Sequence, residues 1–358
     1  MNLKKREIIV VLCTAARGGM RTVVESYQST GLFETWNAKL IHTHNDGGIH
    51  VKLFYFIRAL AIFSYLATFY HIKFIHNHSA MRGSFWRKNV FSSIARFFGI
   101  PVLLHLHGSE MQTFYNSSSI KKQRKISNIL SKATTVIVLS KSWESFILNI
   151  SPNAKVKIIY NFVTLPNIVE KKITSQELPI NILFLGLLGK RKGVYDLIDA
   201  AEQLKLNGKN FNLLIGGNGE VDEVHDLVIK KELENCVEVL GWVGKEAKEQ
   251  LLSKTDVYIL PSYNEGLPMS VLEAMSWGIP VVSCNVGGIP ELIRHRVDGY
   301  VINPGNVAEI QKVLTELIGS KSIREKYGES ARQRIESKFS DIKIIPKLNN
   351  LFVKTSTK

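Results

Sequence analysis

Two carboxylates lie eight residues apart in the segment Pro261–Glu273, which reads PSYNEGLPMSVLE. Before them, Asp256–Leu260 predicts a short buried strand, and the proline, serine, asparagine and glycine residues that follow predict a turn. An apolar pattern then predicts a helix that ends at Gly278. We therefore expect Glu265 in the loop over the helix N-terminus and Glu273 inside the helix, about a turn and a half deeper.

This arrangement suits a ligand with phosphate and hydroxyl groups. Backbone N–H groups at the positive end of a helix dipole form a ready site for a diphosphate. The segment that would provide this binding site consists of Gly266, Leu267, Pro268, Met269 and Ser270. An ionised Glu273 can accept hydrogen bonds from two neighbouring hydroxyls, such as those of a ribose, and Glu265 would reach the sugar side. On the spacing alone, both acids could equally be ordinary complements of the helix dipole.

The longer run Leu260–Ile293, which includes EAMSWGIPVV and GGIPELI, closely resembles the signature of retaining glycosyltransferases of family 4. The Glu-x7-Glu pair is that family's donor-site motif. The resemblance implies the α/β GT-B fold, in which two Rossmann-like doubly wound domains face each other across a cleft. It also implies transfer of a hexose from a UDP- or GDP-linked sugar with retention of anomeric configuration, without a metal or other cofactor, in bacterial surface-polysaccharide or lipopolysaccharide biosynthesis.

A second motif, Gly186–Gly193 (GLLGKRKG), follows a predicted strand and opens a helix. It resembles the phosphate-clamp loop of the family, and the resemblance assigns Arg191 and Lys192 to neutralising the departing diphosphate, with Gly186 at the donor. The chain departs from the family at Leu187, where an arginine usually follows the first glycine. A solvated basic turn is the alternative interpretation.

Four further residues gain a role only from the resemblance. Gly18 and Gly19, directly after the first predicted strand, resemble the N-terminal glycine loop of the family. Gly217, in GGNG after another strand, resembles a glycine turn near the nucleotide base; the full Gly-x-Gly-x-x-Gly spacing is absent, so NAD binding is disfavoured. His107 resembles the cleft histidine that contacts the transferred hexose. It would act with Glu265, while Glu273 would hold the ribose.

Three histidine pairs end predicted strands, which is where an open α/β sheet places its ligands. The pairs are His42/His44, His76/His78 and His105/His107. Their spacing also suggests zinc, but no cysteine or acidic ligand set accompanies them. We therefore expect no metal site. Ser140 and Asn161, at the ends of two other predicted strands, are lesser candidates for the cleft.

The length of 358 residues favours two domains, and strands alternate with helices throughout. We expect an N-terminal Rossmann-like acceptor domain at 1–165, a linker at 166–178 and a donor domain at 179–339. Residues 340–358 would form a segment that returns to the N-terminal domain. The three cysteines are widely spaced. We therefore expect them to be free thiols in a reducing compartment.

The charge of the chain is asymmetric. Met1–Leu165 has 21 Lys and Arg against 6 Asp and Glu, whereas Pro166–Lys358 has 25 of each. An anionic membrane surface, nucleic acid or a merely solvated basic face could explain the excess. No nucleic-acid recognition module is evident. We expect a peripheral protein on the cytoplasmic face of the membrane, with a saccharide or lipid-linked acceptor.

Two segments imitate membrane signals. Lys4–Arg6 before Ile8–Cys13 imitates a signal peptide but fits a first strand better. Leu53–Ile72 is long and apolar enough to span a bilayer, yet Arg58 would be costly there, so we expect a buried helix of a Rossmann-like domain.

Two other functions remain open from the sequence. A nucleotide-sugar epimerase or hydrolase of the same architecture would bind the same donor without needing an acceptor. A non-catalytic partner subunit of a glycosyltransferase would retain the nucleotide pocket, and the departure at Leu187 is consistent with it.

Overall fold

The computed structural model describes residues 6–167 and 179–357, so the expected linker lies outside the described residues from position 168 onward. The chain divides into two compact units. The first unit combines Met1–Phe162 with Asp341–Lys358, and the second is Val163–Ser340. The C-terminal segment therefore belongs with the N-terminal residues.

The first unit is built on a parallel six-stranded sheet in the order β2-β1-β3-β4-β5-β6. Its strands alternate with helices because each parallel neighbour needs a crossover connection. The strands are β1 (Glu7–Cys13), β2 (Ala38–His42), β3 (His71–Ser79), β4 (Val102–Leu106), β5 (Thr135–Val138) and β6 (Val156–Ile158).

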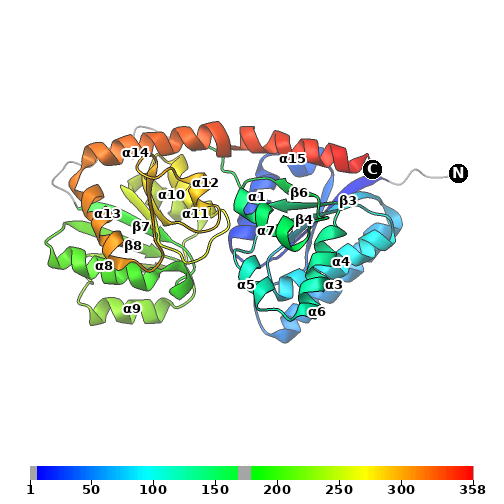
Figure 1. The fold of residues 1–358 in the computed structure, drawn as a ribbon, viewed down its shortest axis with the longest axis horizontal. Helices are drawn as coiled ribbons and strands as arrows, with labels where there is room; N and C mark the ends of the chain where they lie inside the picture. The colour runs from blue at the N-terminus through cyan, green and yellow to red at the C-terminus, as the bar shows by residue number, and fades with distance from the viewer. Residues whose placement is uncertain (1–5, 168–178, 358) are drawn as a thin grey trace. The chain divides into compact units, whose positions relative to one another are not determined.

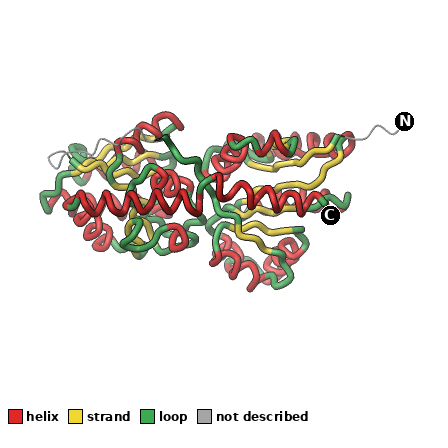
Figure 2. Tube along the Cα trace, turned by 90° about the horizontal axis from the view of Figure 1, so that it is seen from above, coloured by secondary structure: helices red, strands yellow, loops and turns green. Residues whose placement is uncertain are grey.

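Helices cover both faces of this sheet (Figures 1 and 2). They are α1 (Gly19–Ser29), α2 (Leu32–Thr35), α3 (Ile49–Phe69), α4 (Gly83–Phe97), α5 (Met111–Asn116), α6 (Ile120–Ser131), α7 (Lys141–Ile150) and α15 (Asp341–Ser356). Helices α3 and α4 pack on the side of β1 that includes Val10 and Leu12. On the other side, Tyr27 of α1 stacks on His76 of β3.

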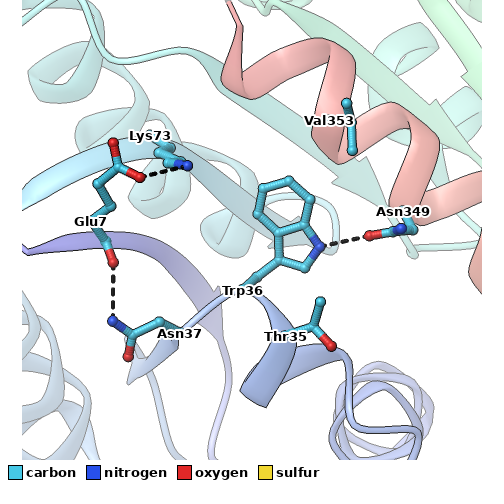
Figure 3. Close-up of a pocket in the computed structure, with 7 residues that line it drawn as sticks. All are labelled: Glu7, Thr35, Trp36, Asn37, Lys73, Asn349 and Val353. Carbon is cyan, nitrogen blue, oxygen red and sulfur yellow. Dashed lines mark hydrogen bonds and ion pairs between the residues drawn. The ribbon is translucent and has the colours of Figure 1, made fainter.

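The C-terminal helix α15 docks on the first unit through aromatic contacts. Phe352 lies edge-on to Trp36 and against Phe74, with ring centroids 5.6 and 4.9 Å apart. The indole Nε1 of Trp36 donates to Asn349 Oδ1 at 2.7 Å, at the rim of a surface pocket shown in Figure 3. Because Phe352 is fully buried, this helix is part of the first unit's core.

The second unit repeats the architecture with a parallel sheet in the order β12-β11-β10-β7-β8-β9. Its strands are β7 (Ile180–Leu185), β8 (Phe211–Gly216), β9 (Val237–Gly241), β10 (Val257–Leu260), β11 (Val281–Cys284) and β12 (Gly299–Ile302). Its helical segments are η1 (Lys190–Lys192), α8 (Val194–Leu206), α9 (Val221–Lys230), α10 (Lys245–Lys254), α11 (Met269–Ser276), α12 (Ile289–Leu292), α13 (Val307–Gly319), α14 (Lys321–Arg334) and η2 (Ile335–Phe339). The two units confirm the predicted α/β class.

One prediction about the first unit is wrong. The apolar run Leu53–Ile72 forms most of α3, but this helix is not buried. Only three of its residues are buried: Ala59, Phe63 and Leu66. Among the described residues, α3 is also the one helix whose length and composition would suffice to cross a membrane. The hydrophobic pattern alone could not reveal this, because a buried helix and an exposed apolar helix share it.

Candidate donor site

The segment that follows β10 adopts the predicted strand–turn–helix arrangement. The strand ends at Leu260, and α11 begins at Met269 with Pro268 as its N-cap. The helix ends before Gly278, whose φ of +69° suits glycine. Glu265 therefore lies in the loop, 4% exposed, and Glu273 is the fifth residue of α11.

The N-terminus of α11 has no capping side chain. The first backbone N–H groups of a helix lack intrahelical partners, so their dipoles point toward the loop side of the site. Met269 and Ser270, the first two helical residues, are placed where a diphosphate would accept from them. Leu267 and Met269 are both largely buried, which fixes the turn.

A salt bridge connects the two predicted donor motifs. Lys192 Nζ lies 2.5 Å from Glu265 Oε1, and both side chains are mostly buried. The backbone secures this contact, because Tyr263 N donates to Arg191 O at 2.9 Å. Arg191 Nη1 donates to Asn264 O at 3.4 Å. Residues 73 positions apart in the chain thus form one cluster of charge.

Glycines allow the loops of this cluster to approach each other closely. A Cβ atom on Gly193, at φ +72°, would lie 2.1 Å from Pro261 O. One on Gly217 would lie 1.7 Å from Gly186 O, and one on Gly287 would lie 1.8 Å from Glu265 O. No side chain fits at such distances, so these three glycines bring four loops together at the carboxyl ends of β7, β8, β10 and β11.

Glu273 has a partner that the sequence did not suggest. Lys248 of α10 places Nζ 2.5 Å from Glu273 Oε1. Burial raises the pKa of Glu273, and the charge of Lys248 opposes that rise. The pairing keeps an inward-facing carboxylate compensated inside α11. Because Lys248 stands 25 positions upstream on another helix, no local motif indicates it.

Leu187, where the chain departs from the family's usual arginine, lies at the surface in the structure. Its side chain is 46% exposed and offers no donor. The neighbouring Lys190 is exposed, whereas Arg191 and Lys192 are partly covered by the Pro261–Ser270 loop. Arg191 and Lys192 are therefore the cations of this loop that contact the segment before α11.

In the first unit, Gly18 and Gly19 lie at the start of α1, after β1, with open space around both. His107 follows β4 and lies half-buried. A hydrogen bond of 2.8 Å joins its Nε2 to Nδ1 of His78. Burial, and secondarily the charge of Lys88, lowers the pKa of His107 to about 3. His107 is therefore neutral at pH 7 and can donate or accept a hydrogen bond to a hydroxyl.

Four histidines form a ladder on one face of this sheet. His76 and His78 on β3 lie beside His105 and His107 from β4 and the loop after it, and His76 Nε2 lies 3.2 Å from His105 Nδ1. Side chains two residues apart in a strand point to the same face of a sheet. The two histidines of each pair therefore share one face, as the sequence predicted. Ring nitrogens of His76, His78 and His105 lie within 4.8 Å of one another. One hydrogen bond joins His76 to His105 and another joins His78 to His107, whereas Nε2 of His78 and Nε2 of His105 have no hydrogen-bond partner among the described residues. By its geometry this group of three histidines could hold a metal ion, and it includes no carboxylate.

Two other polar residues of the first unit have surroundings that the sequence did not indicate. Ser140 caps α7 by accepting from Trp143 N at 3.2 Å, which is a structural role. Lys88 of α4 is 2% exposed, and burial lowers its pKa to about 7. Its Nζ has no hydrogen-bond partner among the described residues.

Comparison with known proteins defines the class. The structure is similar to a sucrose-phosphate synthase from Thermosynechococcus elongatus, with a TM-score of 0.80, 18% identity and coverage of 98% of this chain and 99% of that one. It is also similar to Anabaena HepE in complex with UDP and glucose, with a TM-score of 0.74, 20% identity and coverage of 96% and 99%. The fold is therefore GT-B.

Sequence comparison gives a more specific match for the second unit than the comparison of folds does. Residues 167–334 match the family of glycosyl transferases group 1. An uncharacterized glycosyltransferase of Methanocaldococcus jannaschii is 33% identical over 57% of this chain and 56% of its own length. The amylovoran biosynthesis glycosyltransferase AmsK of Erwinia amylovora is 31% identical over 45% and 42%. The matches span about half the length of these relatives. Together they support a GT-B glycosyltransferase.

Proposed function

We propose that the protein is a retaining glycosyltransferase of family 4 that moves a hexose from a UDP- or GDP-linked sugar to a saccharide or lipid-linked saccharide. The observation that carries the proposal is the cluster of Lys192, Glu265 and the uncapped N-terminus of α11. It places cationic and dipolar groups beside a carboxylate, as a charged diphosphate attached to a hydroxyl-rich sugar requires.

The chemistry proposed for the site is electrostatic. The acceptor hydroxyl attacks the anomeric carbon on the face from which the diphosphate leaves, so configuration is retained. The bond from the anomeric carbon to the diphosphate oxygen breaks, and the proton of the acceptor passes to that oxygen. Lys192, Arg191 and the amides at the start of α11 stabilise the leaving charge. This positive charge takes the place of a metal ion in the proposal.

The remaining residues bind the donor. We assign Glu265 to the hydroxyls of the hexose, where Lys192 holds its carboxylate in place. Glu273 takes the ribose hydroxyls, and Gly186 and Gly217 let the nucleotide approach the backbone. His107, as a neutral imidazole, contacts the transferred sugar. Gly18 and Gly19 leave open space at the start of α1 for the donor or acceptor.

The biological setting is also a proposal. AmsK is named for amylovoran biosynthesis, and other relatives are named for colanic acid biosynthesis. These names support polysaccharide biosynthesis, and we propose assembly of a surface polysaccharide or lipopolysaccharide. The basic first unit supports a lipid-linked acceptor at the cytoplasmic face of the membrane.

The test is analysis of products. The protein is incubated with UDP-glucose, UDP-galactose or GDP-mannose and a polyprenyl-diphosphate-linked monosaccharide, with and without EDTA. We expect one donor to yield a longer saccharide whose new linkage keeps the donor's anomeric configuration, at a rate that EDTA does not change. An inverted linkage would refute retention. Free hexose as the product with every acceptor would favour the hydrolase.

A further inference from the structure

Helix α3 turns an apolar face to the solvent. Six of its large apolar or aromatic side chains are more than half exposed: Ile49, Leu53, Phe54, Ile57, Tyr65 and Phe69. Its opposite face packs Ala59, Phe63 and Leu66 into the core. A helix that covers a sheet in a water-soluble protein usually has a polar outer face. The outer face of α3 instead forms an apolar strip along the whole helix.

A second exposed apolar group lies beside this strip. Helices α3 and α4 are neighbours (Figure 1), and Phe91 of α4 contacts both Phe56 and Phe63 of α3. At the end of α4, Phe97 and Phe98 are 84% and 62% exposed. Both helices run back along parallel strands, so their C-terminal ends lie at the same edge of the sheet. The exposed apolar surface therefore extends from α3 to the end of α4.

The segment that forms this surface carries charged residues of only one sign, and Asp46 directly precedes it. Gly47–Ser109, which includes α3 and α4, has no aspartate or glutamate. Arg58 is exposed in the middle of the strip. Next to α4, the ammonium of Lys125 lies 5.2 Å from the ring of Trp86, and α6 exposes three more basic residues, Lys121, Lys122 and Arg124. An apolar strip bordered by cations complements an anionic lipid surface.

The topology shows how the helix would meet the lipid. Strands β2 and β3 both pair with β1 in parallel, and α3 is the crossover between them. Both ends of α3 are thus fixed to the sheet, and its inner face is part of the core. A helix held in this way lies along a bilayer surface and does not cross it. A second copy of the chain is a poorer occupant, because two such basic faces would repel each other.

We propose that α3, with Phe97 and Phe98, inserts into the headgroup region of an anionic bilayer as a monotopic helix. Arg58 and the cations of α6 would then contact lipid phosphates while the apolar side chains enter the acyl boundary. This inference deepens the acceptor side of the proposed function and rests on that function for its purpose. The contact itself depends only on the surface of the first unit.

Vesicle flotation of the full chain tests the insertion. The vesicles contain phosphatidylglycerol mixed with phosphatidylcholine, or phosphatidylcholine alone. The variant is Phe54→Gln with Ile57→Gln, which removes apolar surface without changing charge. Its matched control is Leu206→Gln with Ile229→Gln, which removes exposed apolar side chains from the second unit. We expect binding to the anionic vesicles to fall about tenfold or more in the α3 variant and to stay unchanged in the control.

Three results of this flotation assay would overturn the proposal. They are failure of the wild type to float with anionic vesicles, equal flotation of both double variants, and complete release of the wild type by high salt, which would indicate electrostatic contact without insertion. A dimer in solution that the α3 variant separates would also contradict it, by assigning the strip to a second copy. Stabilisation by UDP or GDP, measured on the same samples, shows separately whether the donor site is intact.

Discussion

At the residue scale, the salt bridge between Lys192 and Glu265 combines two roles. The exposed fractions of the two side chains are 15% and 6%, so each charge depends on the other for compensation. When a diphosphate enters, the ammonium of Lys192 can contact the phosphate while still orienting the carboxylate. In the proposed mechanism, the same contact would therefore prepare both the leaving-group side and the sugar side of the site.

Replacing Lys192 tests this role directly. We expect Lys192→Ala to lower kcat about 10²- to 10³-fold with saturating donor, because the charge that stabilises the leaving group is lost. Lys192→Arg should retain more of the rate. The matched control is Lys190→Ala, an exposed lysine of the same loop, which should leave kcat close to that of the wild type. Equal rates for the two alanine variants would exclude Lys192 from the reaction.

The sequence could predict this part of the site because its signals are local. Glu265 and Glu273 share one turn and one helix, so the proline and glycine punctuation around them fixes where each falls. The partners of those acids could not be predicted in the same way. Lys192 and Lys248 reach them from other loops and helices, and only the sheet order brings these elements together.

At the element scale, glycine conformation holds the loops of the second unit together. Gly193 links η1 to α8 with a φ of +72°, and a Cβ atom there would lie 2.1 Å from the carbonyl oxygen of Pro261. Gly208 has a similar φ of +64° but has open space where a Cβ would lie. Alanine substitutions at Gly193 and Gly208 therefore distinguish two effects on stability. Both would strain the backbone, but only the one at Gly193 would also cause a steric clash.

We predict that Gly208→Ala costs about 1 kcal/mol of unfolding free energy, from the left-handed backbone alone. Gly193→Ala should cost at least about 2 kcal/mol more, because the methyl group must displace the Pro261 loop. Urea unfolding of the purified variants measures both values. A Gly193→Ala protein as stable as Gly208→Ala would mean that the loop yields without resistance.

The histidine ladder of the first unit predicts a dependence of stability on pH. Burial, and secondarily the neighbouring histidines, lowers the pKa of His76 to about 3 and those of His78 and His105 well below their usual value. A histidine whose pKa is depressed by folding binds its proton more readily when unfolded. The stability that it contributes is therefore complete above about pH 6.5 and is lost as the pH falls toward the folded pKa.

We expect the first unit to lose up to about 2 kcal/mol of unfolding free energy per fully buried histidine between pH 7 and pH 5. Chemical denaturation at a series of pH values measures this slope. His78→Asn should reduce the slope, whereas His71→Gln, at an exposed histidine, should leave it unchanged. Stability that stays constant over this pH range would contradict the neutral, buried ladder.

Helix α3 marks the limit of prediction for single elements. Length and apolar composition indicated a long helix, and the structure contains one, but the same composition suits a core helix and an interfacial helix. What distinguishes them is which neighbours cover the helix. The burial of α3 depends on the position of α4 and on the edge of the sheet. The sequence of the twenty-one residues of α3 contains no information about either.

At the scale of the whole molecule, the two units share an architecture and differ in charge. The first unit has 25 Lys and Arg against 7 Asp and Glu, and the second has 21 against 24. Composition alone indicates this division, because the basic excess is confined to one part of the chain. It separates a basic unit suited to an anionic partner from a nearly neutral one, whose basic loop Lys190–Lys192 lies where we propose that the nucleotide sugar binds.

The most direct test of the central claim is thermal unfolding of the protein with UDP, GDP, ADP and CDP. A ligand at about a hundredfold excess over its dissociation constant adds about 2.7 kcal/mol of stability, enough to shift the midpoint visibly. We predict that one nucleotide raises the midpoint, that Glu273→Ala abolishes the shift and that Glu249→Ala, at an exposed neighbour of Lys248, retains it. No shift with any nucleotide in the folded protein, or a shift that survives Glu273→Ala, would contradict the donor site.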